Sequence, residues 1–308
     1  MVTRRFAPYR ELGRTGFVAT RLGAGDLADA TQPFEACVAT LSRALDAGLN
    51  LVDTAPSYEE GLSERIVGAA LAGRREGIFL IDKIDHFDRP VAEQLEGSME
   101  RLGGLRPDLF VFHGVSTLES WRALAAPGGR FEELGHAVHA GKARFRGISS
   151  HHPDVLRDAI PSGLCDVVMF PVGAFVDARY VDEMLPLAKK HGVGTVCFKT
   201  FGAGKLLGDT EGYGRPLAAR PRGKVSSGGA DRDEDAVLPR LRVPECLRYT
   251  LTCDPDVALL GLSFPNEQDA AFAAAEAFTP LSPSELTELR ERAAVAMRNK
   301  GAAWWNPP

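Results

Sequence analysis

Residues 34–54, FEACVATLSRALDAGLNLVDT, combine a helical pattern with a strand pattern. The apolar side chains that recur at helical spacing are Phe34, Cys37, Val38, Leu41 and Leu45. Gly48 follows as a natural C-terminal cap, because glycine tolerates the left-handed backbone that often ends a helix. The run LNLVDT (49–54) then predicts a buried strand. This segment therefore reads as a helix that leads directly into a strand.

The same unit recurs along the whole chain. Short β-branched or aliphatic runs alternate with amphipathic stretches, and turn residues lie between them. The strand candidates are 17–25, 49–54, 77–84, 108–114, 143–150, 166–172, 192–200 and 258–263. The helical stretches are 34–45, 64–71, 91–102, 131–140, 153–160, 180–191, 245–252 and 267–278. Eight units of this length favour an α/β fold closed into a (β/α)8, or TIM, barrel.

A doubly wound sheet is the alternative for such alternation. That fold usually has a glycine-rich GxGxxG turn after its first strand. Here the first strand leads into LGAGDLADA (22–30), which does not match. Because composition does not break between the units, we expect one barrel domain over residues 1–308.

Two segments depart from the repeating pattern. Residues 202–238 are rich in Gly, Arg, Asp and Ser, and predict a mobile loop. Because it follows the seventh strand, this loop is either a lid over a ligand or an insertion without function. The other segment is a C-terminal helix and tail over 282–308, opened by a capping box of Ser282 and Glu285. In the tail, residues 304–305 are tryptophans that could close the side of the barrel or reach its mouth.

Composition limits the kinds of partner. The 36 Lys and Arg residues against 41 Asp and Glu give a net charge of -5, without a long block of either sign. Such a surface argues against nucleic acid or acidic lipid, so a small molecule is expected. No apolar stretch reaches the length of a membrane span, and the N-terminus lacks the apolar core of a signal peptide. Five scattered cysteines without a CxxC pair suit buried thiols in a reducing compartment. We therefore expect a cytoplasmic protein, of undefined oligomeric state.

Four polar residues lie at or beyond successive strand ends, where barrels carry their active sites. Asp53 ends the second strand and Tyr58 follows it in the loop. Lys83 lies in the apolar third strand and needs a counter-charge, which Asp53 can provide. His113 closes the fourth strand. A nearby ammonium lowers the pKa of a phenol and stabilises its phenolate, so this group predicts a proton-donating centre.

Each of these residues has a structural interpretation when taken alone. Asp53 could be a turn residue, and Tyr58 a rim aromatic. Lys83 could form a buried ion pair without chemistry, and His113 could be a core histidine. Their combination at the strand ends favours function. A zinc site that adds the histidines at 151–152 is not expected, because adjacent strand residues point to opposite faces.

With these residues in view, the chain resembles aldo-keto reductases of bacteria. The segments that carry the resemblance are YRELGRTGFVATRLGAG (9–25), ALDAGLNLVDTAPSYEEGLSERIVGAAL (44–71), FLIDKI (79–84), RPDLFVFHG (106–114), GKARFRGISS (141–150), VCFKTFGAGKLL (196–207) and CLRYTLTCDPDVALLGLS (246–263). The most specific part is 50–64, which is close to the family pattern Asp-Thr-Ala-x-x-Tyr-Gly. The resemblance implies a (β/α)8 barrel with Tyr58 as general acid. It also implies that Lys83 and Asp53 tune this acid, and that His113 lies beside the carbonyl.

The resemblance also implies a nicotinamide cofactor, NADP(H) first and NAD(H) as the alternative. The expected cofactor contacts are Gly25, Ser149, Ser150, Met169, Phe198, Lys199, Gly202, Ser263 and Gln268. Ser150 and Met169 replace the usual Asn and Gln, which removes amide contacts. Near Gln268 there is no Arg or Lys for a 2′-phosphate, so the choice between the two cofactors stays open.

The expected activity is reduction of an aldehyde or ketone to an alcohol by NAD(P)H, or the reverse oxidation. A side chain cannot supply a hydride, which is why a cofactor is needed. The alternative is a regulatory barrel protein that binds the cofactor but turns over weakly. The changed positions Ser150 and Met169 keep this alternative open. The substrate is not defined by the sequence.

Overall fold

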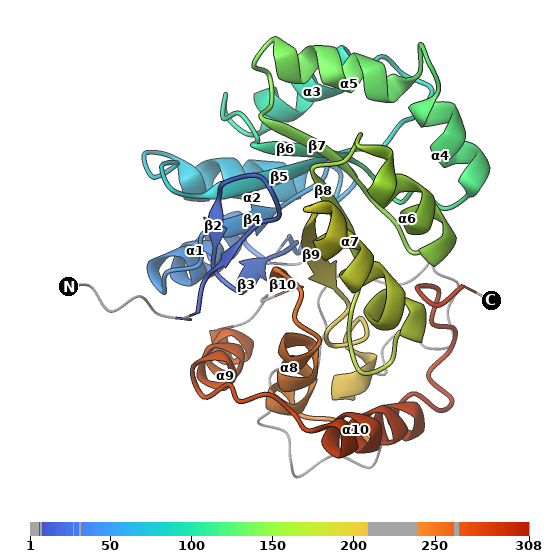
Figure 1. Cartoon of the computed structure of the whole chain (residues 1–308). Coiled ribbons are helices and arrows are strands. Elements are labelled where there is room, and N and C mark those ends of the chain that lie inside the picture. The colour runs from blue at the N-terminus through green and yellow to red at the C-terminus, as the bar shows by residue number, and fades with distance from the viewer. Residues whose placement is uncertain are drawn as a thin grey trace.

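Eight parallel strands close into a barrel in the order β10-β3-β4-β5-β6-β7-β8-β9, and helices surround it (Figure 1). The computed structural model describes residues 6, 8–26, 28–30, 32–208, 239–261 and 265–307. The barrel strands are β3 (Leu22–Ala24), β4 (Leu51–Asp53), β5 (Phe79–Ile84), β6 (Leu109–Phe112), β7 (Phe145–Ser149), β8 (Val167–Pro171), β9 (Gly194–Phe198) and β10 (Val257–Leu260). The predicted (β/α)8 barrel is confirmed.

The first predicted strand, 17–25, was wrong as a single element. It contains β2 (Val18–Ala19), which pairs antiparallel with β1 (Arg10–Glu11), and then β3. Between them the Thr20 N–H donates to the Asn50 side chain at 2.7 Å, and the Thr20 hydroxyl donates to the Leu22 carbonyl at 2.7 Å. These bonds turn the backbone away from a continuous strand.

Helices follow the strands around the barrel. They are α1 (Phe34–Asp46), α2 (Leu62–Leu71), α3 (Val91–Arg101), α4 (Leu118–Ala125), α5 (Arg130–His139), α6 (Pro153–Ala159), α7 (Leu185–His191), α8 (Val243–Thr252), α9 (Pro265–Glu276) and α10 (Pro283–Ala296). Helix α4 was not predicted, although Thr117 caps it by accepting from the Ser120 N–H. The predicted helix 180–191 starts as a π-helix, η2 (Tyr180–Met184). Pro186, at the start of α7, lacks the N–H that a regular helix would use there. None of the described helices is long and apolar enough to cross a membrane.

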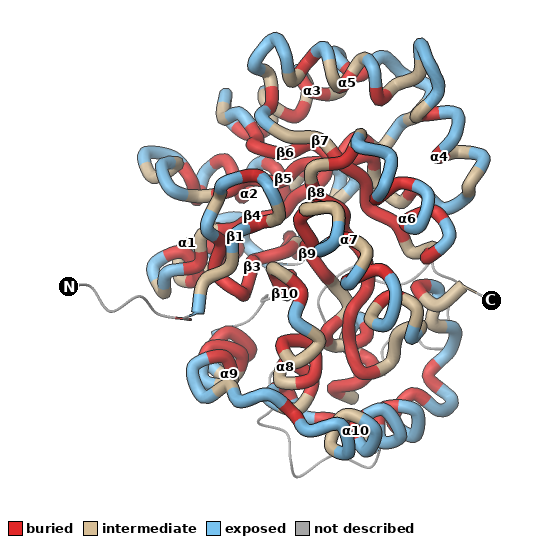
Figure 2. Tube along the Cα trace, in the orientation of Figure 1, coloured by how far each residue is buried: buried red, intermediate tan, exposed pale blue. Residues whose placement is uncertain are grey.

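The barrel interior is apolar through most of its height. Phe79 and Ile81 of β5 pack inside it with side chains from the other strands, and both are fully buried. Strands are buried along their length, whereas the outer surfaces of the helices are exposed (Figure 2). Since strand side chains alternate in direction, Lys83 is the next inward position after Ile81. The polar end of the interior therefore begins at Lys83.

The C-terminal segment reaches the mouth of the barrel. The predicted capping box is confirmed, since the Ser282 side chain accepts from the Glu285 N–H and the Glu285 carboxylate accepts from the Ser282 N–H. After α10 the tail lies on the loop that follows β8, where the buried Trp305 donates from its indole to the Phe175 carbonyl at 2.9 Å. Of the two places foreseen for the tryptophans, the structure thus supports the mouth.

The predicted mobile loop 202–238 is described only over its first residues. There the chain makes a turn and the 3-10 helix η3 (Lys205–Leu207), with Leu206 and Leu207 buried. Residues 202–208 thus include apolar side chains that pack into the core, and the mobility of the loop stays a prediction. Residues 209–238 lie outside the described residues.

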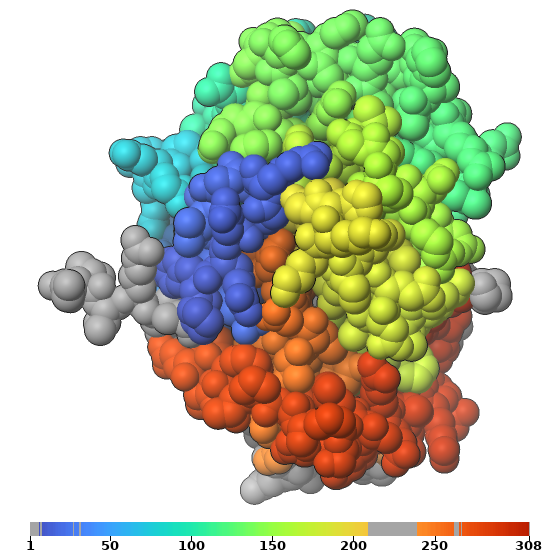
Figure 3. All heavy atoms as spheres, viewed as in Figure 1, coloured from blue at the N-terminus to red at the C-terminus, as the bar shows by residue number. Residues whose placement is uncertain are grey.

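The N-terminal hairpin lies against the start of β9. In Figure 3 the blue N-terminal segment lies against a yellow segment from later in the chain. The Arg14 N–H donates to the Gly192 carbonyl at 2.8 Å. A Cβ added at Gly13 would lie 2.2 Å from the Gly194 nitrogen, so only glycine allows this approach.

We predict that Gly13→Ala destabilises the protein far more than Gly16→Ala. Both glycines have positive φ, 49° and 71°, but a Cβ at Gly16 meets nothing within 4 Å. Gly16→Ala should therefore cost only the left-handed penalty, about 1–2 kcal/mol. Gly13→Ala should add about 1–3 kcal/mol of overpacking. Urea unfolding of both variants measures the difference, and equal losses would contradict the contact with β9.

Candidate active site

A buried ion pair joins the ends of β4 and β5. The Lys83 ammonium donates to the Asp53 carboxylate at 2.7 Å and to the Thr54 carbonyl at 2.8 Å. Both charged side chains are 2% exposed, so neither relies on water for solvation. Burial alone would lower the pKa of Lys83, but attraction to Asp53 and Tyr58 outweighs it and raises that pKa above its usual value. Lys83 is therefore charged over the whole working range of pH.

Tyr58 and His113 lie beside this pair. The Lys83 nitrogen is 4.3 Å from the centroid of the Tyr58 ring, and the Tyr58 and His113 ring centroids are 5.6 Å apart, edge to face. Tyr58 enters the site from the loop after β4, and His113 directly follows β6. The structure thus brings together all four residues that the sequence predicted to act as a group.

The electrostatics of Tyr58 differ from the expectation. Burial raises the pKa of Tyr58 above its usual value, and the Lys83 charge opposes this only in part. The predicted net lowering was wrong, because the Lys83 charge is already compensated by Asp53 while the phenolate would lose its hydration. Tyr58 is therefore held protonated at neutral pH, which is the form of a proton donor.

Asp85 fixes the orientation of His113. One carboxylate oxygen of Asp85 lies 2.5 Å from His113 Nδ1, and the other accepts from the Ser57 N–H at 2.8 Å. Burial would raise the pKa of Asp85, but hydrogen bonds from His113 and Ser57 outweigh it and lower that pKa. An ionised carboxylate at Nδ1 favours a proton on that nitrogen, which leaves Nε2 for a ligand.

The sequence analysis missed Asp85, although a signal was present. In LIDKID, Asp85 lies two positions after Lys83 and so shares its inward direction.

Several predicted cofactor residues are engaged within the fold. The Ser149 hydroxyl accepts from the Gly114 N–H at 2.8 Å, and the Ser150 hydroxyl donates to the Val115 carbonyl at 2.7 Å. Met169 is fully buried in the apolar barrel interior. Their cofactor contacts stay predictions, and Ser263 lies outside the described residues.

The remaining predicted cofactor residues lie at the ends of β3 and β9. The Gly25 N–H donates to the Leu260 carbonyl at 2.7 Å. Phe198 ends β9 as a half-buried ring, 5.1 Å from the His151 ring. Lys199 follows it, and its carbonyl accepts from the Gly202 N–H at 2.9 Å. This corner of the mouth therefore presents an aromatic ring and a cation together.

Gln268 joins two helices and is buried between them. Its side-chain N–H donates to the Thr40 carbonyl of α1 at 2.8 Å, and its carbonyl accepts from Arg43 at 2.9 Å. Arg43 also pairs with Asp269. A cation from α1 thus lies at the first turns of α9, where the local sequence has none. The sequence analysis missed it because Arg43 is 225 positions away.

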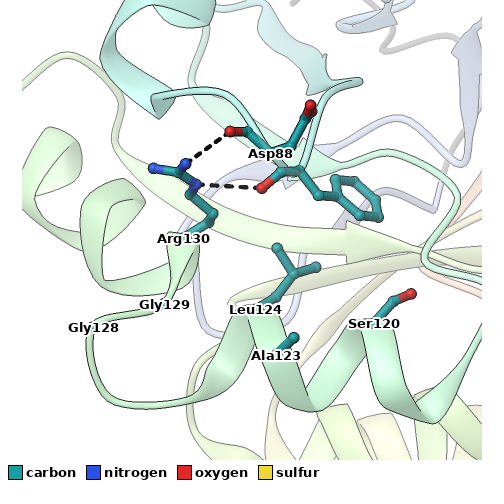
Figure 4. A pocket seen from close by; sticks show the side chains of 8 residues that line it. Asp88, Ser120, Ala123, Leu124, Gly128, Gly129 and Arg130 are labelled. Carbon is teal, nitrogen blue, oxygen red and sulfur yellow. Dashed lines mark hydrogen bonds between the residues drawn. The ribbon is translucent and has the colours of Figure 1, made fainter.

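A separate cavity of about 590 Å³ lies between the loop after β5 and helices α4 and α5 (Figure 4). Its lining is Phe87, Asp88, Ser120, Ala123, Leu124, Gly128, Gly129 and Arg130. The Arg130 guanidinium is occupied there, because it donates to the Phe87 and Asp88 carbonyls. The predicted catalytic group of Asp53, Tyr58, Lys83 and His113 does not line this cavity.

Comparison with known proteins agrees with this geometry. A sequence profile described as "Aldo/keto reductase family" matches residues 21–293. The chain belongs to the aldo/keto reductase family. Aldo-keto reductase YhdN of Bacillus subtilis is 29% identical over 227 residues, which are 67% of this chain and 66% of that protein. The NADH-specific methylglyoxal reductase of Escherichia coli is 26% identical over 226 residues, 64% of this chain and 68% of that protein.

Solved structures support the same family. Aldo-keto reductase AKR11C1 from Bacillus halodurans, in its holo form, is 28% identical with a TM-score of 0.70. The match covers 95% of this chain and 99% of that one. Against YhdN, the matched region spans just under two thirds of the relative's length.

We predict that Lys83→Met destabilises the reductase by about 3–5 kcal/mol, since it leaves Asp53 buried without a partner. Burial already raises the pKa of Asp53, and loss of the Lys83 charge should raise it further, so the destabilisation should grow as pH rises from roughly 5 to 8. The control is the double variant Asp53→Asn with Lys83→Met, which removes both charges and should regain part of the loss. Urea unfolding at both pH values tests this. A single variant as stable as the double would contradict a compensated ion pair.

Proposed function

We propose that this aldo/keto reductase reduces an aldehyde or ketone with NAD(P)H, and that Tyr58 is its general acid. The observation that carries the proposal is a protonated phenol beside a charged, fixed ammonium at the polar end of the barrel. A relative named as a methylglyoxal reductase and one named as a pyridoxal 4-dehydrogenase support carbonyl and alcohol chemistry in either direction. No comparable observation favours the regulatory alternative.

A nicotinamide held at the mouth of the barrel would supply the hydride for the carbonyl carbon. Tyr58 donates the phenolic proton to the carbonyl oxygen, so its O–H bond breaks as the alcohol O–H bond forms. Lys83 stabilises the phenolate that remains, and Asp53 keeps Lys83 in place. His113 Nε2, without a proton of its own, can accept a hydrogen bond from the hydroxyl of the alcohol. The phenolate then regains a proton from solvent, and in the oxidative direction it accepts one from the alcohol.

The residues present fit a nicotinamide cofactor. The half-buried ring of Phe198, at the end of β9, offers a face to the nicotinamide, and Ser149 ends β7, two strands away around the barrel. A Cβ at Gly25 would lie 3.3 Å from the Leu260 carbonyl, so glycine allows the chain after β3 to approach β10 closely. Arg43 lies beside Gln268 but is paired with Asp269, so NADP(H) stays the first candidate and NAD(H) the second in view of the NADH-specific relative.

We expect Tyr58→Phe to lower kcat for carbonyl reduction by about 10²–10⁴-fold, the usual contribution of a general acid. The assay follows loss of NADPH or NADH absorbance with a panel of aldehydes and ketones. Cofactor affinity, measured by fluorescence quenching, should persist because the phenol acts on the substrate. Since the pKa of Tyr58 is raised, the wild-type rate should not fall from loss of this proton between roughly pH 7 and 9. Unchanged turnover in Tyr58→Phe would overturn the mechanism.

We expect Asp85→Asn to lower kcat/KM by about tenfold or more, because His113 loses the partner that selects its proton position. Asn has the same size, so the loop should remain folded. Asp88→Asn is a suitable control, since Asp88 lies on the same loop and, among the described residues, its contact is the backbone carbonyl that accepts from Arg130. The readout is the pH profile of kcat/KM, which Asp85→Asn should change relative to wild type and Asp88→Asn should not. Profiles that coincide with wild type would show that Asp85 has only a structural role.

A further inference from the structure

Lys199 carries an ammonium that is surrounded by aromatic rings at the mouth of the barrel. Its nitrogen lies 5.3 Å from the Phe198 ring centroid, 5.2 Å from that of Trp304 and 5.8 Å from that of Trp305. Within the described part of the chain, no hydrogen bond or ion pair to this ammonium is found, and the side chain is half-buried. Aromatic faces attract a cation but do not neutralise it. Such a charge is costly to keep unless an anion joins it.

The backbone at Lys199 has a strained conformation, and this conformation sets the direction in which the side chain leaves the main chain. Its φ is +74°, a left-handed conformation that non-glycine residues rarely adopt. The surrounding structure fixes it, since the Gly202 N–H donates to the Lys199 carbonyl at 2.9 Å. Gly173 packs so closely that a Cβ there would lie 2.6 Å from the same carbonyl. Held strain of this kind concentrates at functional sites.

Two neutral polar atoms close to Lys199 also lack partners. His151 Nε2 and Thr200 Oγ1 are buried and make no hydrogen bond within the described residues. Burial, helped by the charges of Lys199 and His113, lowers the pKa of His151 to about 3. His151 is therefore a neutral imidazole close enough to both His113 and Lys199 for their charges to act on it. A ligand that carries an anionic group at one end of its chain would find complementary groups here.

We propose that Lys199 binds a carboxylate or phosphate carried by the carbonyl substrate, with His151 and Thr200 as neutral groups beside it. This rests on the proposed function, and it narrows the substrate class to anionic aldehydes and ketones. It also differs from the expectation that Lys199 contacts the cofactor. The pyrophosphate of the cofactor offers the same chemistry, so the experiment must separate the two sources.

The test compares 4-oxobutanoate with its neutral methyl ester in the wild type and in Lys199→Met, which keeps the side-chain length without the charge. Glyceraldehyde 3-phosphate and glyceraldehyde form the matched phosphate pair. The wild type should prefer the acid, and Lys199→Met should reduce the acid-to-ester ratio of kcat/KM by about tenfold or more, as for loss of a charge-assisted contact. Lys199→Arg should keep most of the preference, which shows that the charge matters rather than the fold.

A binding measurement gives the same test without turnover. Calorimetry with 4-oxobutanoate and the protein–NADP⁺ complex, a pairing that holds no hydride donor for the aldehyde, should show about tenfold weaker binding in Lys199→Met. Two outcomes would overturn the proposal. In the first, Lys199→Met changes neither the kcat/KM ratios of the two substrate pairs nor the affinity in calorimetry. In the second, Lys199→Met weakens NADPH binding but keeps the substrate ratios, which would assign Lys199 to the pyrophosphate of the cofactor. Wild type that reduces neither acid nor ester would count against the proposed function, while calorimetry still decides the role of Lys199.

Discussion

The contact between Lys83 and Asp53 is the constraint on which the site depends. A charged amine that follows fully buried Phe79 and Ile81 on an inward strand face has no water to solvate it. It therefore requires a carboxylate at close range, and this requirement fixes the relative positions of β4 and β5 at their polar ends. Tyr58 and His113 are arranged around this pair. The ion pair thus solves a solvation problem, and the proton transfer that we propose would use the same geometry.

The same pair explains why Tyr58 remains protonated. An ammonium already compensated by a carboxylate stabilises a neighbouring phenolate less than an isolated one would, so burial dominates the pKa of the phenol. Between reactions Tyr58 is therefore a neutral phenol, and in the proposed mechanism its phenolate exists only during turnover. Asp85 acts in a parallel way on the other side, because its bonds to His113 and to the Ser57 N–H tie the imidazole to the Tyr58 loop.

Much of this architecture could be predicted from local patterns. The period of apolar residues located every barrel strand, and residues at strand ends such as Asp53 and His113 were grouped because parallel strands end at one rim. Interactions between distant segments could not be found in this way. Arg43 meets Gln268 across 225 positions, and the Tyr58 pKa depends on burial, which no spacing reveals. Thr20 divided the first strand through its bond to Asn50, a partner outside any local window.

The C-terminal tail is held to the loop after β8 by Trp305, whose carbonyl also accepts from the Tyr180 hydroxyl at 3.2 Å. Trp304 and Trp305 thereby form a wall of the mouth that belongs to none of the eight strand-and-helix units. Mutations in this wall leave the strand ladder intact, because they change no barrel hydrogen bond. The shape of the mouth on this side is therefore set by a segment whose folding is separate from the pairing of the barrel strands.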